Sequence, residues 1–186
     1  ITGIVDKDKI ITGKNISPGD VLVGLPSNGL HTNGYSLARK IFFKDMGYDV
    51  DTYLESLKNS VGAALLEPHI NYTNHVFKLL NERININGIA HITGGGLTEN
   101  IPRILPNGCS VKIQKGNWPT LPIFDTLKDL GNIEEDEMYH AFNMGIGMVF
   151  IVDSDYVDAI EKALNNITNI YTIGEVIEGE NIVHYN

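Results

Sequence analysis

Three consecutive glycines, Gly94, Gly95 and Gly96, follow a short apolar run in a segment that also holds Asn100 and Arg103. Because they lack side chains, the glycines let a ligand approach the backbone closely. Backbone amides at the start of a helix and a forked guanidinium are groups that bind phosphate. The segment has neither the Gly-Lys-Ser/Thr ending of a P-loop nor the Gly-x-Gly-x-x-Gly dinucleotide pattern. It predicts a phosphate-binding loop, and the alternative is a tight strand-to-helix connection with a surface arginine.

A second polar segment joins another apolar run to a predicted helix and contains Ser27, Asn28, His31 and Asn33. Polar side chains and free backbone N–H groups gather there at the positive end of the helix dipole, which suits an anion or a polar substrate. The alternative is a capped turn, in which Asn28 and Gly29 form the turn and Asn33 caps the helix. The spacing alone leaves both interpretations open.

The other candidate residues favour structural roles. The glycine-bearing segment 142–148 leads into a predicted strand, and a packing contact between sheet and helix explains it better than a ligand contact. His91 is expected to be a hydrogen-bonded strand histidine, and Cys109 a small buried apolar residue. The remaining candidate ligands show no metal-binding spacing with one another: His69, His75, His140 and His184. We therefore predict no metal site and assign no catalytic residue.

Composition excludes several classes of protein. The 186 residues carry 14 Lys and Arg against 23 Asp and Glu, a net charge of −9, which disfavours nucleic-acid binding. No run of roughly 18 apolar residues predicts a membrane span. The single cysteine, Cys109, and the lack of a visible signal peptide favour the cytoplasm. The chain starts at Ile1, within a predicted strand, from which we expect a piece of a longer protein.

Hydrophobic periodicity predicts alternating strands and helices. Predicted strands cover 21–25, 89–92, 109–113 and 146–152, with hairpins at 1–5/10–12 and 171–177/181–185. Predicted helices cover 33–46, 72–82, 97–105, 122–130 and 134–142, and another follows the cap at 153–155. Hairpins require antiparallel pairs, so we expect one layered α/β/α domain of the α+β class over 1–186, with a mixed, largely antiparallel sheet.

Several of these segments, taken in order, resemble one enzyme family. The similarity is carried by 19–37, by 91–96 with 99–103, by 137–139 and 142–148, and by the closing 173–176. Together they closely resemble the second half of the phosphoribosylformylglycinamidine cyclo-ligases, also called aminoimidazole ribonucleotide synthetases. The resemblance covers essentially the whole chain, and several long motifs agree in order and spacing.

The resemblance implies that residues 1–186 are the C-terminal domain of a two-domain synthetase of purine biosynthesis. That family uses ATP and Mg²⁺, held mainly by an N-terminal half that is absent here, to close the imidazole ring of formylglycinamidine ribonucleotide. The chain alone is then expected to be inactive, its partner is its own N-terminal domain, and the full enzyme is expected to be a homodimer. The implied substrate- or phosphate-binding residues are those of the two loops: Gly94, Gly95, Gly96, Asn100 and Arg103, with Ser27, Asn28, His31 and Asn33.

Two alternatives remain from the sequence. A related half-domain occurs in other ATP-dependent enzymes of the same superfamily, such as thiamine-monophosphate kinase and selenophosphate synthetase. The long stretches 31–35 and 99–103 favour the cyclo-ligase over these. The other alternative is a non-catalytic binding module.

Overall fold

The computed structural model describes residues 2–186, and its centre is a six-stranded sheet. The strands are β1 (Val21–Pro26), β4 (Gly88–His91), β5 (Cys109–Ile113), β6 (Ile146–Val152), β7 (Tyr171–Glu178) and β8 (Val183–Tyr185), in the order β4-β6-β1-β7-β5-β8. Every neighbouring pair is antiparallel except β5 and β8, which run parallel. The expected mixed, largely antiparallel sheet is confirmed.

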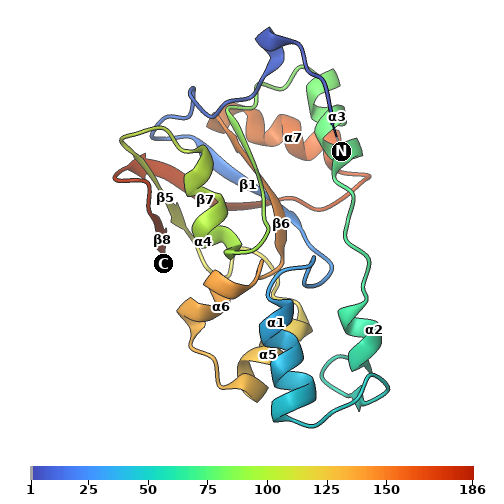
Figure 1. The fold of residues 1–186 in the computed structure, drawn as a ribbon. Coiled ribbons are helices and arrows are strands. Elements are labelled where there is room, and N and C mark those ends of the chain that lie inside the picture. The colour runs from blue at the N-terminus through green and yellow to red at the C-terminus, as the bar shows by residue number, and fades with distance from the viewer. Residues whose placement is uncertain (1) are drawn as a thin grey trace.

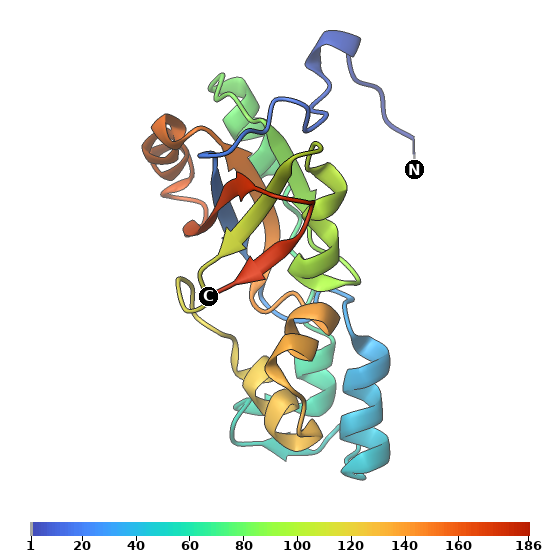
Figure 2. The same ribbon diagram turned by 90° about the vertical axis from the view of Figure 1, so that its left-hand side faces the viewer.

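Helices cover both faces of this sheet. On one face, α3 (Thr73–Asn81) and α7 (Val157–Leu164) bury Leu79 and Ile160 against Val23 and Phe150. On the other, α4 (Gly96–Asn100) lies over alternate residues of the same strands. Figure 2 shows α4 and α7 on opposite sides of the sheet. Because side chains alternate along each strand, β1 and β6 supply both apolar layers.

The remaining helices gather beyond one end of the strands, as Figure 1 shows. They are α1 (Tyr35–Arg39), which continues as a π-helical turn over Lys40–Asp45, α2 (Val61–Leu65), α5 (Pro122–Gly131) and α6 (Glu135–Ala141). Short elements complete the fold: β2 (Tyr53–Leu54), β3 (Asn59–Ser60), and 3-10 turns at Lys7–Lys9, Pro102–Ile104 and Ser154–Tyr156. The predicted helices at 72–82, 122–130 and 134–142 are confirmed to within two residues at either end.

The predicted N-terminal hairpin is wrong within the described residues, and Ile1 lies outside them. Residues 2–20 contain one 3-10 turn and no strand. Within residues 2–186 the apolar residues that suggested strands pair with no strand, and they remain exposed: Ile4 by 100% and Ile10 by 49%.

The predicted C-terminal hairpin is also wrong. The strands β7 and β8 are not neighbours, because β5 lies between them. The connection turns across the start of β5: the Gly179 amide donates to the Gly108 carbonyl, and the Asn181 amide donates to the Cys109 carbonyl. A Cβ at Gly179 would lie 2.2 Å from the Ser110 hydroxyl oxygen, so this crossing needs glycine. The final strand therefore adds to β5 in parallel.

Two details of the helices differ from the prediction. Gly34, with φ of +67°, precedes α1 in the N-cap position, and the Asn33 side chain does not cap the helix. The apolar pattern of 72–82 predicts Val76, Phe77, Leu79 and Leu80 on the inward face. In α3, Leu79 is buried, but Phe77 and Leu80 are 56% and 40% exposed. The buried line of α3 runs through His75 and Leu79, one helical turn apart, so the two apolar residues beside it face outward.

Candidate functional site

The two predicted polar loops lie side by side at one edge of the sheet. Both β1 and β4 are antiparallel to β6, so their carboxyl ends reach the same edge. The loop after β1 holds residues 27–33, and the loop after β4 holds residues 92–96. The Asn33 side-chain amide donates to the Ile92 carbonyl at 3.1 Å and joins them directly. The topology therefore brings together two segments whose bonded residues lie 59 positions apart in the sequence.

The loop after β1 is held by Asn143, which is fully buried. Its side-chain oxygen accepts from the Ser27 hydroxyl and from the Gly145 amide, each at 2.8 Å. Its side-chain nitrogen donates to the carbonyls of Gly29 and Leu30 at 2.9 and 3.0 Å. Segment 142–148 therefore holds this loop through hydrogen bonds of the Asn143 side chain, which is a different contact from the predicted packing between sheet and helix, and Ser27 belongs to the same internal network.

Asn100 has the corresponding position in the glycine loop. Its side-chain nitrogen donates to the carbonyls of Thr93, Gly94 and Gly96, at 3.1, 3.1 and 2.8 Å. Its side-chain oxygen accepts from the Thr93 hydroxyl at 3.0 Å. Asn100 is only 5% exposed, so it shapes the loop from behind.

The three glycines have different reasons to be glycine. Gly96, at φ +56°, packs against α6: a Cβ there would lie 2.2 Å from the Tyr139 carbonyl oxygen and 2.5 Å from that of Phe142. Gly95, at φ +93°, has the Glu99 side chain over it, 2.5 Å from where a Cβ would be. Gly94 has nothing within 4 Å of a Cβ. Of the three, only Gly94 has open space beside it.

Arg103 is held at the margin of this loop. Its guanidinium donates to the Asn100 side-chain oxygen at 2.9 Å and to the Glu99 carboxylate at 3.3 Å. Glu99 also contacts the His140 imidazole at 3.3 Å. The Arg103 side chain remains 57% exposed, so its guanidinium can contact a ligand beside the loop while one of its nitrogens is bonded to Asn100.

Three imidazoles come together beside the two loops. The rings of His31 and His69 stack with their centroids 4.1 Å apart, and the Nε2 atoms of His69 and His91 lie 3.1 Å apart in a hydrogen bond. His91 is thus a hydrogen-bonded strand histidine, as expected. Burial, reinforced by the charges that His69 and His91 can carry, lowers the pKa of His31 to about 4. Burial and then His69 also lower the pKa of His91. His31 is therefore neutral near pH 7.

Several polar groups converge on the Nε2 atom of His31. The Asn28 side-chain nitrogen donates to the Glu67 carboxylate and the Pro68 carbonyl, so the Asn28 side-chain oxygen faces His31 Nε2. The backbone amides of Asn28 and Ile70 donate to the same Nε2 atom, each at 3.4 Å. The Nδ1 atom of His31 is buried and has no partner among the described residues.

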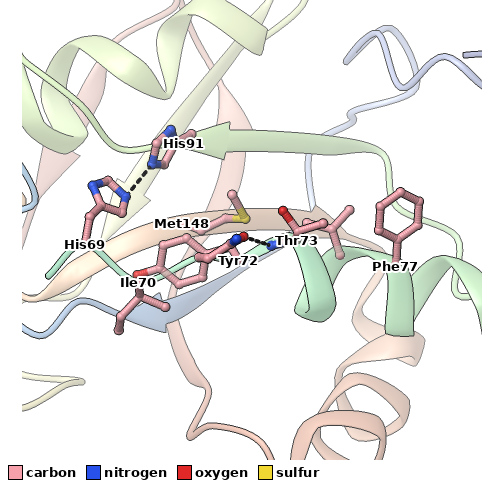
Figure 3. Close-up of a pocket in the computed structure, with 9 residues that line it drawn as sticks. His69, Ile70, Tyr72, Thr73, Phe77, His91 and Met148 are labelled. Carbon is pink, nitrogen blue, oxygen red and sulfur yellow. Dashed lines mark hydrogen bonds between the residues drawn. The ribbon is translucent and has the colours of Figure 1, made fainter. Parts of the chain in front are cut away.

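A hollow of about 530 Å³ opens beside the histidines. Figure 3 shows His69 and His91 facing each other above Tyr72 and Met148, with Phe77 at the far end. The Tyr72 hydroxyl donates to the Pro26 carbonyl at 2.7 Å, and a Cβ at Gly147 would lie 2.1 Å from that hydroxyl oxygen. Gly147 thus makes room for the ring that forms the floor. The hollow combines apolar walls with imidazole groups and suits a ligand with a flat, partly polar ring.

Sequence reasoning missed His69 and Tyr72 as members of the site. They lie on the segment before α3, about 20 residues ahead of His91, and no fixed spacing predicts that the two segments meet.

Among the described residues 2–186, no group of three or more His, Cys, Asp or Glu side chains could hold a metal ion. Within the same residues, no helix has the length and apolar character to cross a membrane. Cys109 is buried, as predicted.

A family model matches residues 17–185 of this chain, and its description is "AIR synthase related protein, C-terminal domain". The chain belongs to this family. The matched range includes both loops at the sheet edge described above.

Curated relatives share close to half of the sequence. A phosphoribosylformylglycinamidine cyclo-ligase of Geobacillus thermodenitrificans is 47% identical over 183 residues, which are 98% of this chain and 53% of that protein. The cyclo-ligase of Trichlorobacter lovleyi is 50% identical over 175 residues, 94% of this chain and 50% of that protein. The chain spans about half the length of the curated relatives it matches.

Solved structures show the same fold at low sequence identity. The thiamine-monophosphate kinase of Stenotrophomonas maltophilia matches with a TM-score of 0.65 and 16% identity, over 98% of this chain and 54% of that one. A structure of the hydrogenase maturation protein HypE in complex with ATP matches with a TM-score of 0.61 and 18% identity, over 94% of this chain and 47% of that one. At these identities the likeness extends to the fold of one half of each protein.

Proposed function

We propose that this chain is the C-terminal half of an ATP-dependent cyclo-ligase that converts formylglycinamidine ribonucleotide to aminoimidazole ribonucleotide. The observation that carries the proposal is 46–50% identity, over nearly the whole chain, to relatives that bear the cyclo-ligase name. The solved neighbours share 15–20% identity and therefore favour no particular reaction. The reaction belongs to de novo purine synthesis, and we place it in the cytoplasm.

In the proposed enzyme this domain forms one wall of a cleft whose other wall is the preceding half. Gly94 and Arg103 would meet a phosphate of ATP or of the ribonucleotide, because they combine open backbone with an exposed cation, whereas the Glu99 side chain covers Gly95. Asn100 and Gly96 would act by shaping that loop. Ser27, Asn28, His31 and Asn33 would shape or line the adjoining loop. The chain's charge of −9 makes such local donors necessary for anionic ligands.

When bound, ATP would supply the phosphoryl group that turns the formamide oxygen into a good leaving group, so that the amidine nitrogen can close the ring. The residues of this chain would hold the phosphate-bearing groups in line and exclude water. Among the described residues, no group of three or more His, Cys, Asp or Glu side chains could hold a metal ion. In the proposed enzyme, Mg²⁺ would be held mainly by the preceding half. The full enzyme is proposed to be a homodimer.

The test of this proposal is ring closure by the full-length protein with Arg103→Ala. Loss of a charge-assisted hydrogen bond of roughly 1.5–3 kcal/mol predicts a fall of about 10- to 100-fold in kcat/KM for ATP or for formylglycinamidine ribonucleotide. The control is Arg83→Ala, at an exposed position at the end of α3. Unchanged kinetics for both substrates in Arg103→Ala would remove Arg103 from the site. The proposed reaction would be overturned if the full-length parent protein did not close the imidazole ring and instead phosphorylated thiamine monophosphate.

A further inference from the structure

One carboxylate lies directly over the glycine loop. The Glu99 side chain covers Gly95, with a carboxylate oxygen 2.5 Å from where a Cβ of that glycine would lie. Its two oxygens contact the Arg103 guanidinium and the His140 imidazole, each at 3.3 Å. Charge-assisted N–H···O bonds are usually about 2.7–2.9 Å long, so both contacts are loose. The Glu99 side chain is 46% exposed, and its carboxylate is therefore free to exchange these contacts for a closer partner.

The position of Glu99 limits what the glycine loop can bind. Gly94 has open space beside it and Arg103 is exposed, so the loop offers a place for a phosphate. The Glu99 carboxylate lies beside that place and would repel a ligand that carried negative charge alone. A positive group bound next to the phosphate would pair with Glu99 instead. The charges at the loop therefore favour an anion and a cation bound side by side.

The proposed reaction brings two such groups together. The phosphoryl group is transferred to the formamide oxygen, and the amidine nitrogen attacks the formamide carbon, so phosphate and amidine meet at one carbon atom. An amidine is a strong base that carries a positive charge near neutral pH. Its N–C–N fork has the geometry of one edge of a guanidinium, which is the group that Glu99 contacts in Arg103. A carboxylate that accepts from a guanidinium can accept from an amidine in the same way.

Arg103 keeps its partners when Glu99 turns to an amidine. One guanidinium nitrogen donates to the Asn100 side-chain oxygen at 2.9 Å, and a different nitrogen contacts Glu99. The second nitrogen becomes available to a phosphate as the carboxylate leaves it. Arg103 thus exchanges a carboxylate for a phosphate, Glu99 exchanges a guanidinium for an amidine, and neither charge is left unpaired.

We propose that Glu99 determines the specificity of this site by accepting hydrogen bonds from the amidine of the acyclic substrate, beside the phosphate bound by Gly94 and Arg103. This inference rests on the proposed function for the identity of the substrate. It deepens that function, because Glu99 gives the domain a means to distinguish an amidine from the corresponding amide, which is neutral. Ring closure converts the amidine into a less basic aminoimidazole, so Glu99 also binds the product more weakly than the substrate.

The test compares the affinity of the full-length protein for two ribonucleotides by calorimetry. One is formylglycinamidine ribonucleotide, and the other is the corresponding amide, in which oxygen replaces the imino nitrogen. The parent protein should bind the amidine at least about 10-fold more tightly, because only the amidine forms a charge-assisted bond with Glu99. Glu99→Gln should reduce this preference to less than about 3-fold, whereas Glu99→Asp keeps the charge and should keep most of it.

The matched control is Glu82→Gln on α3. Glu82 pairs with Lys78 in the same i,i+4 arrangement of opposite charges, and it is likewise 46% exposed. Its substitution should leave the preference for the amidine unchanged. Both Glu99 variants should bind ATP within about 2-fold of the parent, because the phosphate contacts of Gly94 and Arg103 remain. A loss of ATP affinity in Glu99→Gln as large as the loss for the amidine would mean that Glu99 supports the loop, and it would overturn the inference.

Two further results would overturn the inference: equal binding of the amidine and the amide by the parent, or a preference that Glu99→Gln retains in full. Calorimetry needs no catalysis, so the two proposals can fail separately. Ring closure by a protein whose Glu99→Gln variant retains the preference would overturn this inference alone. A preference that depends on Glu99 in a protein that does not close the ring would overturn only the proposed function.

Discussion

His69 and His91 share one hydrogen bond between their Nε2 atoms, 3.1 Å apart. One ring must donate this proton and the other must accept it, so only one of the two Nε2 atoms carries a proton at the contact. If both rings were imidazolium, two N–H groups and two positive charges would face each other. One proton therefore lies between the two Nε2 atoms, in the wall of the hollow that both rings line.

His69→Ala is expected to raise the pKa of His91 toward its ordinary value. Burial and the neighbouring His69 both lower that pKa in the parent, and the substitution reduces both effects. Titration of the His91 ring by NMR measures the change directly. The control is His140→Ala, on α6 beside Glu99, which should leave the pKa of His91 unchanged. A His91 pKa that falls or stays the same in His69→Ala would contradict this account of the pair.

Stability should decrease as the pH falls from 7.5 to 5, and His31 should account for part of the decrease. Its pKa of about 4 in the folded state lies below the 6.5 expected in the unfolded chain. Between these values the unfolded chain binds more protons, so acid favours unfolding. For this one group the loss is about 2 kcal/mol between pH 7.5 and 5. Urea denaturation of the parent and of His31→Gln across this range measures it.

The His31→Gln variant should show a flatter dependence of unfolding free energy on pH, because glutamine does not titrate. His184→Gln, at an exposed position on β8, is the matched substitution. If His31→Gln keeps the slope of the parent, another group is responsible for the acid sensitivity.

Gly96→Ala and Gly94→Ala should separate folding from ligand contact in the glycine loop. Gly96→Ala should destabilise the domain by at least about 2 kcal/mol, because φ is positive and the new Cβ would overlap two carbonyl oxygens. Gly94→Ala should cost less than about 1 kcal/mol, since its Cβ meets nothing within 4 Å. Chemical denaturation measures both. In the full-length protein, Gly94→Ala should lower kcat/KM, because the proposed phosphate lies beside Gly94. Equal losses of stability in Gly94→Ala and Gly96→Ala would refute the packing argument.

The central strands and the longer helices could be predicted because each carries its own periodic pattern. The stretch 146–152 is apolar on both faces and lies inside the sheet, between β4 and β1. The two hairpins failed for a different reason: adjacency in sequence was taken as pairing in space. Residues 181–185 contain the strand-forming residues Ile, Val and Tyr, but pairing with β5 rather than β7 depends on the turn at Gly179, which packs on Ser110.

The site was predictable to the extent that its residues lie in glycine-rich connections. Both loops follow buried strands, and the topology brings them to one edge. The histidine cluster was not predictable, because His69 comes from a stretch with neither helical nor strand periodicity. The sequence also does not distinguish polar residues that support the loops from polar residues that are exposed to solvent. Asn100 and Asn143 have the same side chain as Asn28, and only their burial shows that they hold loops from inside.

Asn143→Ala should be among the most destabilising substitutions in the domain, by about 3–5 kcal/mol. It would leave the Ser27 hydroxyl, the Gly145 amide and the carbonyls of Gly29 and Leu30 without their buried partner. Asn143→Asp keeps the two accepted bonds but turns a carboxylate oxygen toward the two carbonyls, so it should rescue little. Urea denaturation of both variants, beside Asn117→Ala as the exposed control, measures this. A loss below about 1 kcal/mol for Asn143→Ala would mean that the loop after β1 is held by other contacts.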